Sequence, residues 1–320
     1  MRWRARNSKP SSRADALRGW PAKMTSMALY WAFRVAARAL CLLPQRVGYA
    51  LGRGGGIAAF YLWRGGRRRC IRNMLHVTGG DAARARACAR SSFAHYGCYL
   101  VDFLRFERMT AQDVRRRFQF DGWPLVDAAR AGNGIVFVTL HFGNWDVAAA
   151  ALAEHGLPVS VLAERFGNAR LDRAVVQARE RLGMQVVPAD RMGPGILRAL
   201  QRDDVVALLI DVPQPGGGVG VEVAFFGGTI VVPDGPARIA LRAGAPIVAA
   251  TAPRLGPWSD CYRGEVEVVA FTPSGDREQD ARALTQATMH ALEDMVRRAP
   301  EQWYIFRSLW PADRGGGEAG

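Results

Sequence analysis

A histidine and an aspartate five residues apart, His141 and Asp146, have the residue types and the spacing needed for acid–base chemistry. The apolar run 135–140 predicts a buried strand that stops at His141, and a Gly-Asn turn then leads to Asp146 and an apolar helix over 147–152. The Asp146 carboxylate can therefore fold back to a histidine at the carboxyl edge of a sheet. Such an imidazole takes a proton from an attacking hydroxyl while the carboxylate holds its tautomer. The spacing leaves a second interpretation open, in which an isolated histidine stands near a helix-capping aspartate.

The elements that must position this pair follow from the hydrophobic pattern. Asp81 can cap a helix of about 25 residues, and from residue 134 short apolar runs alternate with helical stretches. This alternation predicts an α/β fold with a mostly parallel central sheet flanked by helices, whose strands carry chemistry at their carboxyl ends. We expect strands over 134–140, 158–162, 184–187, 205–210, 246–251 and 265–271, an extended piece over 221–226, and helices over 169–182, 193–201, 233–243 and 277–298.

The run H-F-G-N-W-D at 141–146 resembles the HX4D signature of the lysophospholipid acyltransferase superfamily. The resemblance is to the bacterial branch that contains lipid A lauroyl/myristoyl acyltransferases and phosphatidylinositol mannoside acyltransferases. It extends over about residues 25–311 and implies a glycerolipid acyltransferase-like fold. Its further blocks are E-R-F-G-N-A-R-L-D at 164–172, L-L-I-D at 208–211, F-F-G at 225–227, P-x-G-P-A at 233–237 and P-E-Q-W at 300–303.

The resemblance implies a direct acyl transfer. His141 would deprotonate a sugar or glycerol hydroxyl of a glycolipid acceptor, with Asp146 orienting the imidazole. The hydroxyl would attack the thioester of acyl carrier protein or coenzyme A, so the donor is a substrate and no cofactor is expected. No nucleophilic serine is needed, and the G-x-S-x-G pattern is absent from the sequence.

Three further residues are candidates for substrate binding. Arg165 occupies the position of the family's functional arginine and would bind a phosphate or the developing oxyanion. Asp211, at a strand end, would position an acceptor hydroxyl or pair with Arg165, and Glu222 is a weaker candidate on the acceptor side. Each has a plainer alternative: a surface ion pair with Glu164 or Asp172 for Arg165, a turn residue for Asp211, and a solvated strand glutamate for Glu222.

Two departures from the family pattern leave the acceptor lipid open. Val-Pro-Gln at 212–214 stands where the family often has a second polar or acidic pair, and Arg-Ser-Leu at 307–309 stands where it often has histidine and paired arginines. Lipid A precursors and mannosylated phosphatidylinositol are both compatible with the remaining sequence. A thioesterase or esterase that uses the same pair, and a non-catalytic lipid-binding protein, are the alternative functions.

The positive charge is concentrated at the N-terminal end. Residues 1–72 hold 16 Lys and Arg against one acidic residue, whereas the other 248 residues hold 27 basic and 28 acidic residues. Apolar residues recur at three- and four-residue spacing over 24–43, with Arg34 and Arg38 on one polar stripe, and a second apolar piece over 47–63 precedes an arginine cluster at 64–72. This pattern predicts helices that lie on an anionic membrane surface. Helices packed on the body with solvated arginines remain the alternative, and the long aliphatic stretches argue against a nucleic-acid partner.

The sequence therefore predicts four regions: a disordered basic tail over 1–22, a membrane-associating helical region over 23–72, an acyltransferase domain over 73–311, and a disordered tail over 312–320. No run of 18 uncharged apolar residues occurs, so we expect a peripheral or monotopic protein on the cytoplasmic face of the inner (plasma) membrane. The five cysteines, with no C-x-x-C pair, fit a reducing compartment.

Two motifs and a metal site are excluded. The segment G-G-G-I-A-A at 54–59 matches a dinucleotide fingerprint, but no strand precedes it and no acidic residue follows at the required distance. The glycine run at 216–220 lacks the lysine of a P-loop and predicts a loop. The five histidines are scattered without metal-ligand spacing, so no metal is expected.

Overall fold

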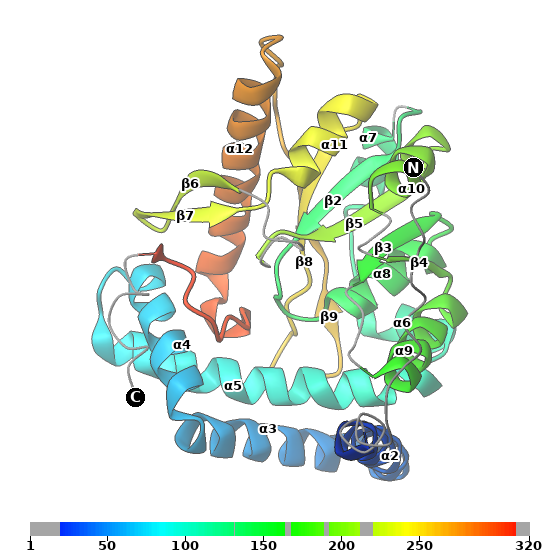
Figure 1. Cartoon of the computed structure of the whole chain (residues 1–320), viewed down its shortest axis with the longest axis vertical. Helices are drawn as coiled ribbons and strands as arrows, with labels where there is room; N and C mark the ends of the chain where they lie inside the picture. The colour runs from blue at the N-terminus through cyan, green and yellow to red at the C-terminus, as the bar shows by residue number, and fades with distance from the viewer. Residues whose placement is uncertain (1–19, 131, 164–167, 189–191, 212–219, 312–320) are drawn as a thin grey trace, which may run out of the picture.

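The centre of the fold is a six-stranded sheet, seen in Figure 1, which draws the computed structural model of the chain. The structure describes residues 20–130, 132–163, 168–188, 192–211 and 220–311. The strands are β2 (Ile135–Thr139), β3 (Val159–Ala163), β4 (Met184–Pro188), β5 (Val205–Leu209), β8 (Ile247–Thr251) and β10 (Glu265–Val268). Their order is β10-β8-β2-β5-β3-β4, and every neighbouring pair is parallel except β10 and β8. The prediction of an α/β fold with a mostly parallel sheet is confirmed.

Helices cover both faces of the sheet. The strands alternate their buried side chains between two hydrophobic clusters, so that Val136 and Val138 of β2 join one cluster while Ile135 and Phe137 join the other. Helices α10 (Met192–Gln201), α11 (Gly235–Ala243) and α12 (Arg277–Arg298) cover the first face. Helices α6 (Ala111–Arg117), α7 (Trp123–Ala129), α8 (Trp145–Glu154) and α9 (Ala169–Arg181) cover the second.

The N-terminal third is a helical layer that runs past the lower end of the sheet in Figure 1. The Asp81 side chain accepts a hydrogen bond from the backbone of Arg84 at 2.9 Å, so the predicted cap is confirmed. The expected boundary at residue 72 falls inside a helix whose Cys70 and Met74 pack in the same cluster as β2. The helices of this layer are α2 (Trp20–Leu42), α3 (Gln45–Leu62), α4 (Arg64–Val77) and α5 (Ala82–Arg105), followed by the short helix η1 (Phe106–Arg108).

The glycine-rich segment rejected as a dinucleotide site lies inside α3, where glycines allow α3 and α5 to approach closely. A Cβ built on Gly56 would lie 2.1 Å from the backbone oxygen of Phe93, and one on Gly97 would lie 2.0 Å from the backbone oxygen of Gly52. Gly54 and Gly55 meet nothing within 4 Å. The spacing of Gly52 and Gly56 therefore serves helix packing rather than phosphate binding.

The extended piece predicted over 221–226 is the first strand of a hairpin, and the second strand of this hairpin was not predicted. Strand β6 (Val221–Phe225) pairs with the antiparallel strand β7 (Gly228–Val232) through a turn at Phe226 and Gly227, whose φ angles are 47° and 72°. The strand predicted over 265–271 ends earlier, because the pairing of β10 with β8 stops at Val268. Two further short strands pair in parallel, β1 (Phe118–Gln119) and β9 (Tyr262–Arg263).

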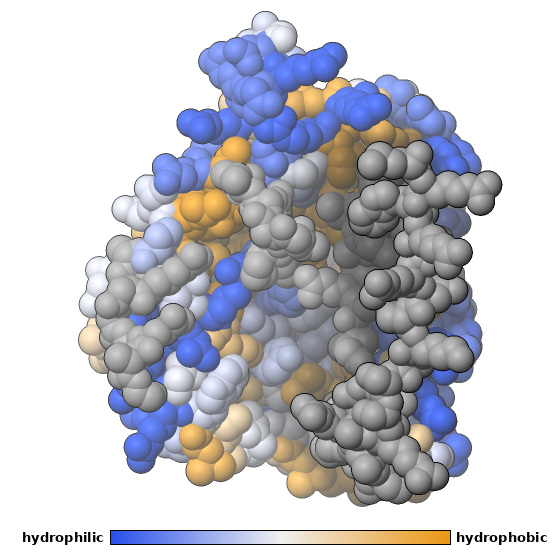
Figure 2. All heavy atoms as spheres, viewed as in Figure 1, coloured by the Kyte–Doolittle hydropathy of each residue, from blue (hydrophilic) through white to orange (hydrophobic). Residues whose placement is uncertain are grey.

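Helices α2 and α3 expose large apolar side chains. Figure 2 shows hydrophobic residues along the lower edge of the view, where these two helices lie in Figure 1. None of the helices in the described part of the chain combines the length and apolar character needed to cross a membrane. The exposed apolar side chains of the two helices are Met27, Trp31, Val35, Leu42, Val47, Leu51, Tyr61 and Leu62.

Candidate active site

The candidate site lies at the carboxyl ends of β2 and β5, which are adjacent in the sheet. The register pairs Thr139 with Leu209, and two residues further along each strand stand His141 and Asp211. Nδ1 of His141 lies 2.8 Å from Oδ1 of Asp211, and the backbone N–H of His141 donates to Oδ2 at 3.0 Å. The neighbouring strands thus place the His141 imidazole and the Asp211 carboxylate in direct contact.

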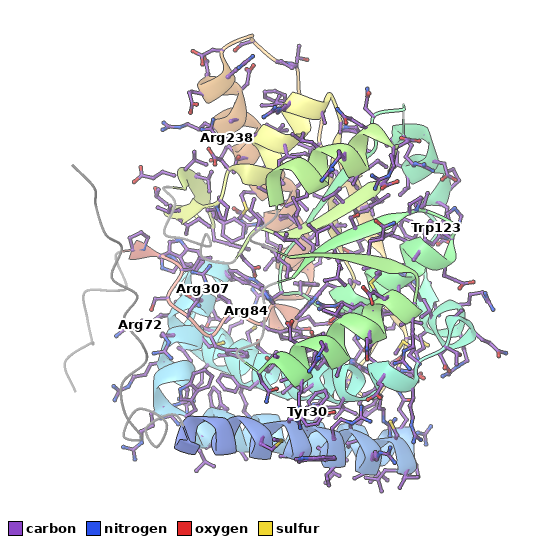
Figure 3. All side chains as sticks on the ribbon, turned by 45° about the vertical axis from the view of Figure 1, so that its right-hand side comes forward. Tyr30, Arg72, Arg84, Trp123, Arg238 and Arg307 are labelled. Atoms are coloured by element: carbon purple, nitrogen blue, oxygen red, sulfur yellow. The ribbon has the colours of Figure 1, made fainter. Side chains whose placement is uncertain are left out.

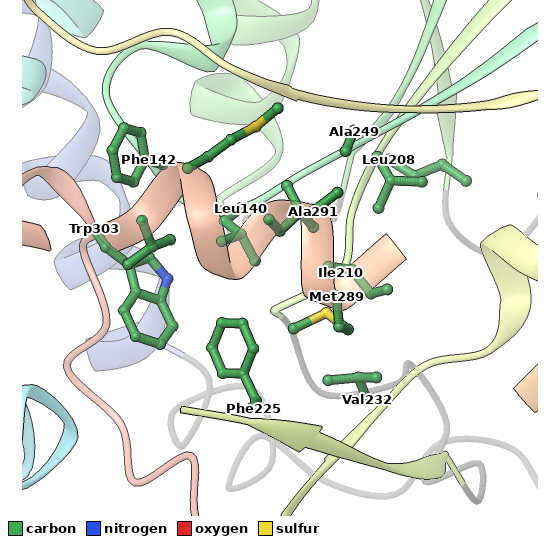
Figure 4. Packing of buried hydrophobic residues seen from close by; sticks show 14 of the residues in the cluster. Leu140, Phe142, Leu208, Ile210, Phe225, Val232, Ala249, Met289, Ala291 and Trp303 are labelled. Carbon is green, nitrogen blue, oxygen red and sulfur yellow. The ribbon is translucent and has the colours of Figure 1, made fainter. Parts of the chain in front are cut away.

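The C-terminal segment after the short helix η3 (Pro300–Gln302) completes the surroundings of Asp211. The indole N–H of Trp303 donates to Oδ2 of Asp211 at 3.0 Å, and the guanidinium of Arg307 donates to the backbone carbonyl of Asp211. Figure 4 shows Trp303 beside Phe225, whose ring centroid is 5.8 Å from that of the indole, and Figure 3 labels Arg307. Because Asp211 is only 2% exposed, the donors of His141 and Trp303 replace the water that an ionised carboxylate requires.

The charges of His141 and Asp211 shift the pKa of each group in opposite directions. Burial lowers the pKa of His141, but the charge and the hydrogen bond of Asp211 outweigh that effect, so this pKa stands above its ordinary value of 6.5. Burial raises the pKa of Asp211, and the charge of His141 with the bonds from His141 and Trp303 outweighs it, so the carboxyl titrates below its ordinary value. An ionised carboxylate only accepts hydrogen bonds. Nδ1 of His141 therefore carries the hydrogen, and Nε2 keeps its lone pair.

The turn after His141 is held from two sides. Gly143 has a φ of 61°, and a Cβ at this position would lie 1.9 Å from the backbone oxygen of Ala252, so only glycine fits. The backbone N–H of Gly143 donates to the carbonyl of Gln302 at 2.9 Å, and that of Tyr304 donates to the carbonyl of His141 at 2.8 Å. The Asn144 side chain then caps α8. These bonds fix the backbone that presents the imidazole.

The expected contact between Asp146 and His141 is not present in the structure. The Asp146 carboxylate accepts hydrogen bonds from the Tyr99 hydroxyl and from Nε of Arg179, each at 2.9 Å. The cause is geometric, because α8 begins at Trp145 and its first turn directs Asp146 toward α5 and α9 rather than back to β2. The carboxylate that bonds the imidazole is Asp211, which was predicted to position an acceptor hydroxyl or to pair with Arg165.

Aromatic rings pack beside the imidazole. The ring of Trp145 meets that of His141 edge to face with centroids 4.9 Å apart, and Tyr99 packs on Trp145 with centroids 4.3 Å apart. Tyr304 lies 6.0 Å from Tyr99 and 6.2 Å from Trp145, centroid to centroid. About a third of the His141 side chain, 32%, remains exposed, so a substrate can still reach it.

Of the remaining predicted residues, Glu222 is not part of this cluster. Arg165 and Glu164 lie outside the described residues. Glu222 is exposed on β6, and its side chain makes no hydrogen bond or ion pair with another described residue. Arg307, to which the sequence analysis assigned no role, lies close enough to lower the pKa of His141, and its place in the C-terminal block that departs from the family pattern was the available signal.

The arrangement can remove a proton from a hydroxyl placed at Nε2 of His141. Among the described residues, the ring of His141 has no hydrogen-bond partner other than Asp211, so a substrate group is free to approach Nε2. Within the same residues, no group of three or more His, Cys, Asp and Glu side chains is placed to hold a metal ion. This geometry is suited to a general base oriented by a carboxylate.

Known proteins resemble the chain over nearly its whole length. Residues 18–311 match the family described as bacterial lipid A biosynthesis acyltransferase. The chain is 28% identical over 300 residues to a phosphatidylinositol mannoside acyltransferase of Mycobacterium tuberculosis, and the match covers 91% of each chain. It is 29% identical over 264 residues to the protein of that name in Mycolicibacterium smegmatis, covering 81% of this chain and 84% of the relative.

Proposed function

The chain belongs to the bacterial lipid A biosynthesis acyltransferase family and is an acyltransferase, and on this premise we propose that it moves a fatty acyl chain from a thioester to a glycolipid hydroxyl. The donor is an acyl thioester of acyl carrier protein or coenzyme A, and no cofactor takes part. The observation that carries the proposal is the 2.8 Å bond between His141 and the buried Asp211, which leaves Nε2 as the base.

The reaction proceeds in two steps at Nε2 of His141. In the first step, Nε2 takes the proton of the acceptor hydroxyl while the hydroxyl oxygen attacks the thioester carbonyl carbon, and a tetrahedral oxyanion forms. In the second step, the carbon–sulfur bond breaks, the thiol leaves with the proton held on Nε2, and the acceptor carries the new ester. Asp211 stabilises the imidazolium between the two steps.

The acceptor that we favour is a mannosylated phosphatidylinositol. The support is the name of the two mycobacterial relatives, which match this chain over most of its length. A lipid A precursor is the second acceptor to test, because the matching family carries that description. Both acceptors offer sugar hydroxyls next to phosphate groups.

We further propose that the enzyme works as a peripheral or monotopic protein on the cytoplasmic face of the inner membrane. The support is the row of exposed apolar side chains on α2 and α3, which includes Trp31 and Leu42, exposed by 57% and 80%. The arginine cluster of α4 follows directly. Apolar side chains next to arginines fit the interface between acyl chains and anionic headgroups.

The test uses membranes that contain the wild type, His141→Ala, or His290→Ala, a control at an exposed histidine on α12. Each is given a radiolabelled long-chain acyl thioester with phosphatidylinositol mannosides, lipid A precursors or lysophospholipids. We expect the wild type and His290→Ala to label one acceptor class and His141→Ala to label none. If the label appears only in free fatty acid, the protein is a thioesterase. If His141→Ala labels the acceptor at the wild-type rate, His141 is not the base.

A further inference from the structure

A charged cavity between α2 and α9 has no part in the proposed reaction. Its volume is about 950 Å³, and its walls come from α2, η1 and one face of α9. Residues of α9 that line it, among them Arg170, Arg173 and Gln177, follow helical spacing, whereas Arg179 of the same helix reaches the other way to Asp146. Neither His141 nor Asp211 lines the cavity.

The charge of the cavity is positive. Four arginines and two glutamates line it, which leaves a net charge of +2. Both oxygens of Glu107 accept from Arg34 at 2.6 Å, so this carboxylate is already neutralised. The other arginines are Arg170, Arg173 and Arg181, and none of them pairs with a carboxylate among the described residues.

The guanidinium groups of the cavity are held mainly by neutral atoms. Nε of Arg173 donates to the backbone oxygen of Ala169 at 3.2 Å, and Arg181 donates to the backbone oxygen of Glu107. The guanidinium of Arg170 lies 6.0 Å from the ring centroid of Tyr30, a residue of α2 labelled in Figure 3. Each arginine keeps donors that suit the oxygens of a phosphate, and a phosphate would offset the excess charge.

The neighbourhood of the cavity indicates where such a phosphate would come from. Trp31 lines the cavity and is 57% exposed, and the apolar side chains of Val35 and Leu42 continue along the same helix. If these side chains enter a membrane interface, the cavity lies at the depth of the lipid headgroups. This step rests on the membrane association argued above under the proposed function.

We propose that the cavity between α2 and α9 binds the phosphate of an anionic phospholipid headgroup. The guanidinium groups of Arg170 and Arg173 hold the phosphate oxygens, and Tyr30 and Trp31 pack beside the glycerol end of the headgroup. The bound lipid fixes α2 against α9 at the membrane surface. The same chemistry would accept a phosphate of a soluble donor such as coenzyme A, so the test has to separate these two sources.

The test compares three full-length proteins: the wild type, Arg170→Gln/Arg173→Gln, and Arg277→Gln/Arg282→Gln. The third protein loses the same charge from two exposed arginines of α12, outside both the cavity and the proposed membrane face. Calorimetry measures the binding of sn-glycerol 3-phosphate, as the soluble headgroup probe, and of adenosine 3′,5′-bisphosphate. Flotation measures the binding of vesicles of phosphatidylglycerol and phosphatidylcholine.

We expect the cavity variant to bind glycerol phosphate at least tenfold more weakly than the wild type, because the cavity offers converging donors. The α12 variant should stay within about twofold of the wild type for this probe. The cavity variant should also lose more vesicle binding than the α12 variant. If only the adenosine bisphosphate binds saturably, and if this binding depends on Arg170 and Arg173, the cavity is a phosphate site for the soluble donor and not for a lipid headgroup. Absence of saturable binding to either probe, or an equal loss in both variants, would overturn the proposal.

Failure of this proposal differs from failure of the proposed function. His141→Ala should bind glycerol phosphate and vesicles as the wild type does while losing acyl transfer. If His141→Ala retains acyl transfer, the proposed base is wrong whether or not the cavity binds phosphate. If the cavity variant binds as the wild type does, the phosphate site is wrong whether or not His141 is the base.

Discussion

Nδ1 of His141 and Oδ1 of Asp211 lie 2.8 Å apart, although 70 residues separate them in the chain. Adjacent parallel strands in register create this contact, because each residue stands two positions beyond the paired residues Thr139 and Leu209. The aspartate nearest in sequence, Asp146, bonds Tyr99 and Arg179 instead. Substitutions of Asp211 and Asp146 should therefore have different effects, the first on activity and the second on stability.

Asp211→Asn should lower kcat by about 10²–10⁴-fold with little change in the folded fraction. The amide still offers one oxygen to the N–H groups that contact Asp211, but it no longer stabilises the imidazolium at His141. Acyl transfer measured per folded molecule, with the folded fraction taken from circular dichroism, tests this. A kcat within threefold of the wild type would show that Asp211 is not the partner of the base.

Asp146→Asn should act mainly on stability. The change leaves Arg179, whose side chain is 13% exposed, without its carboxylate, and we expect a loss of about 3 kcal/mol in the free energy of unfolding. Chemical denaturation measures this loss. Arg179→Met should restore part of the stability in the Asp146→Asn background, since it removes the unpaired charge. A variant that unfolds like the wild type but has lost kcat would instead support the direct role for Asp146 expected from sequence.

The pH dependence of kcat/KM should report the titration of His141. Its pKa is raised above 6.5, and the neutral ring is the base, so activity should rise with pH through a midpoint above 6.5. Because Arg307 lowers this pKa, Arg307→Gln should move the midpoint to higher pH. Because Asp211 raises it, Asp211→Asn should move the midpoint of the residual activity to lower pH. Values of kcat/KM measured from pH 5 to 9 test the direction of both shifts. If the midpoint moves in the same direction in both variants, the titrating group is not His141 between Asp211 and Arg307.

Much of the fold could be predicted from the sequence, because the strands and helices after residue 134 have clear hydrophobic patterns and Asp81 marks the start of the long helix before them. The sequence also placed His141 and Asp211 at strand ends. It did not show that β2 and β5 are neighbours, since strand order depends on how the whole chain winds. The partners of Asp146 come from α5 and α9, and such long-range contacts leave no local signal.

The glycines of α3 allow a matched test of helix packing. Gly56→Ala should destabilise the protein by about 2 kcal/mol or more, because the new Cβ would lie 2.1 Å from the backbone oxygen of Phe93 on α5. Gly55→Ala, one residue earlier, meets nothing within 4 Å and should stabilise the helix by up to about 1 kcal/mol. Thermal and chemical unfolding of both variants measure the difference. Equal effects would mean that α3 and α5 are not packed through these glycines.

Charged substitutions on the exposed side of α2 should weaken membrane binding. Trp31→Glu/Leu42→Glu places two carboxylates where apolar side chains are 57% and 80% exposed, so the fold should tolerate the change. Each lost apolar insertion should weaken binding to anionic vesicles by about tenfold or more. Leu125→Glu/Val231→Glu is the matched control, with two exposed apolar residues on α7 and β7.

The two double variants should differ in how much of each protein floats with the vesicles. Their activities on a detergent-dispersed acceptor should be the same. The first variant should no longer float with the vesicles, whereas the control should, because α2 belongs to the proposed membrane face and α7 and β7 do not. Activity in detergent should be similar for both, since neither pair of residues contacts His141 or Asp211 among the described residues. If both variants float as the wild type does, α2 does not enter the bilayer, and its apolar side chains must face another partner.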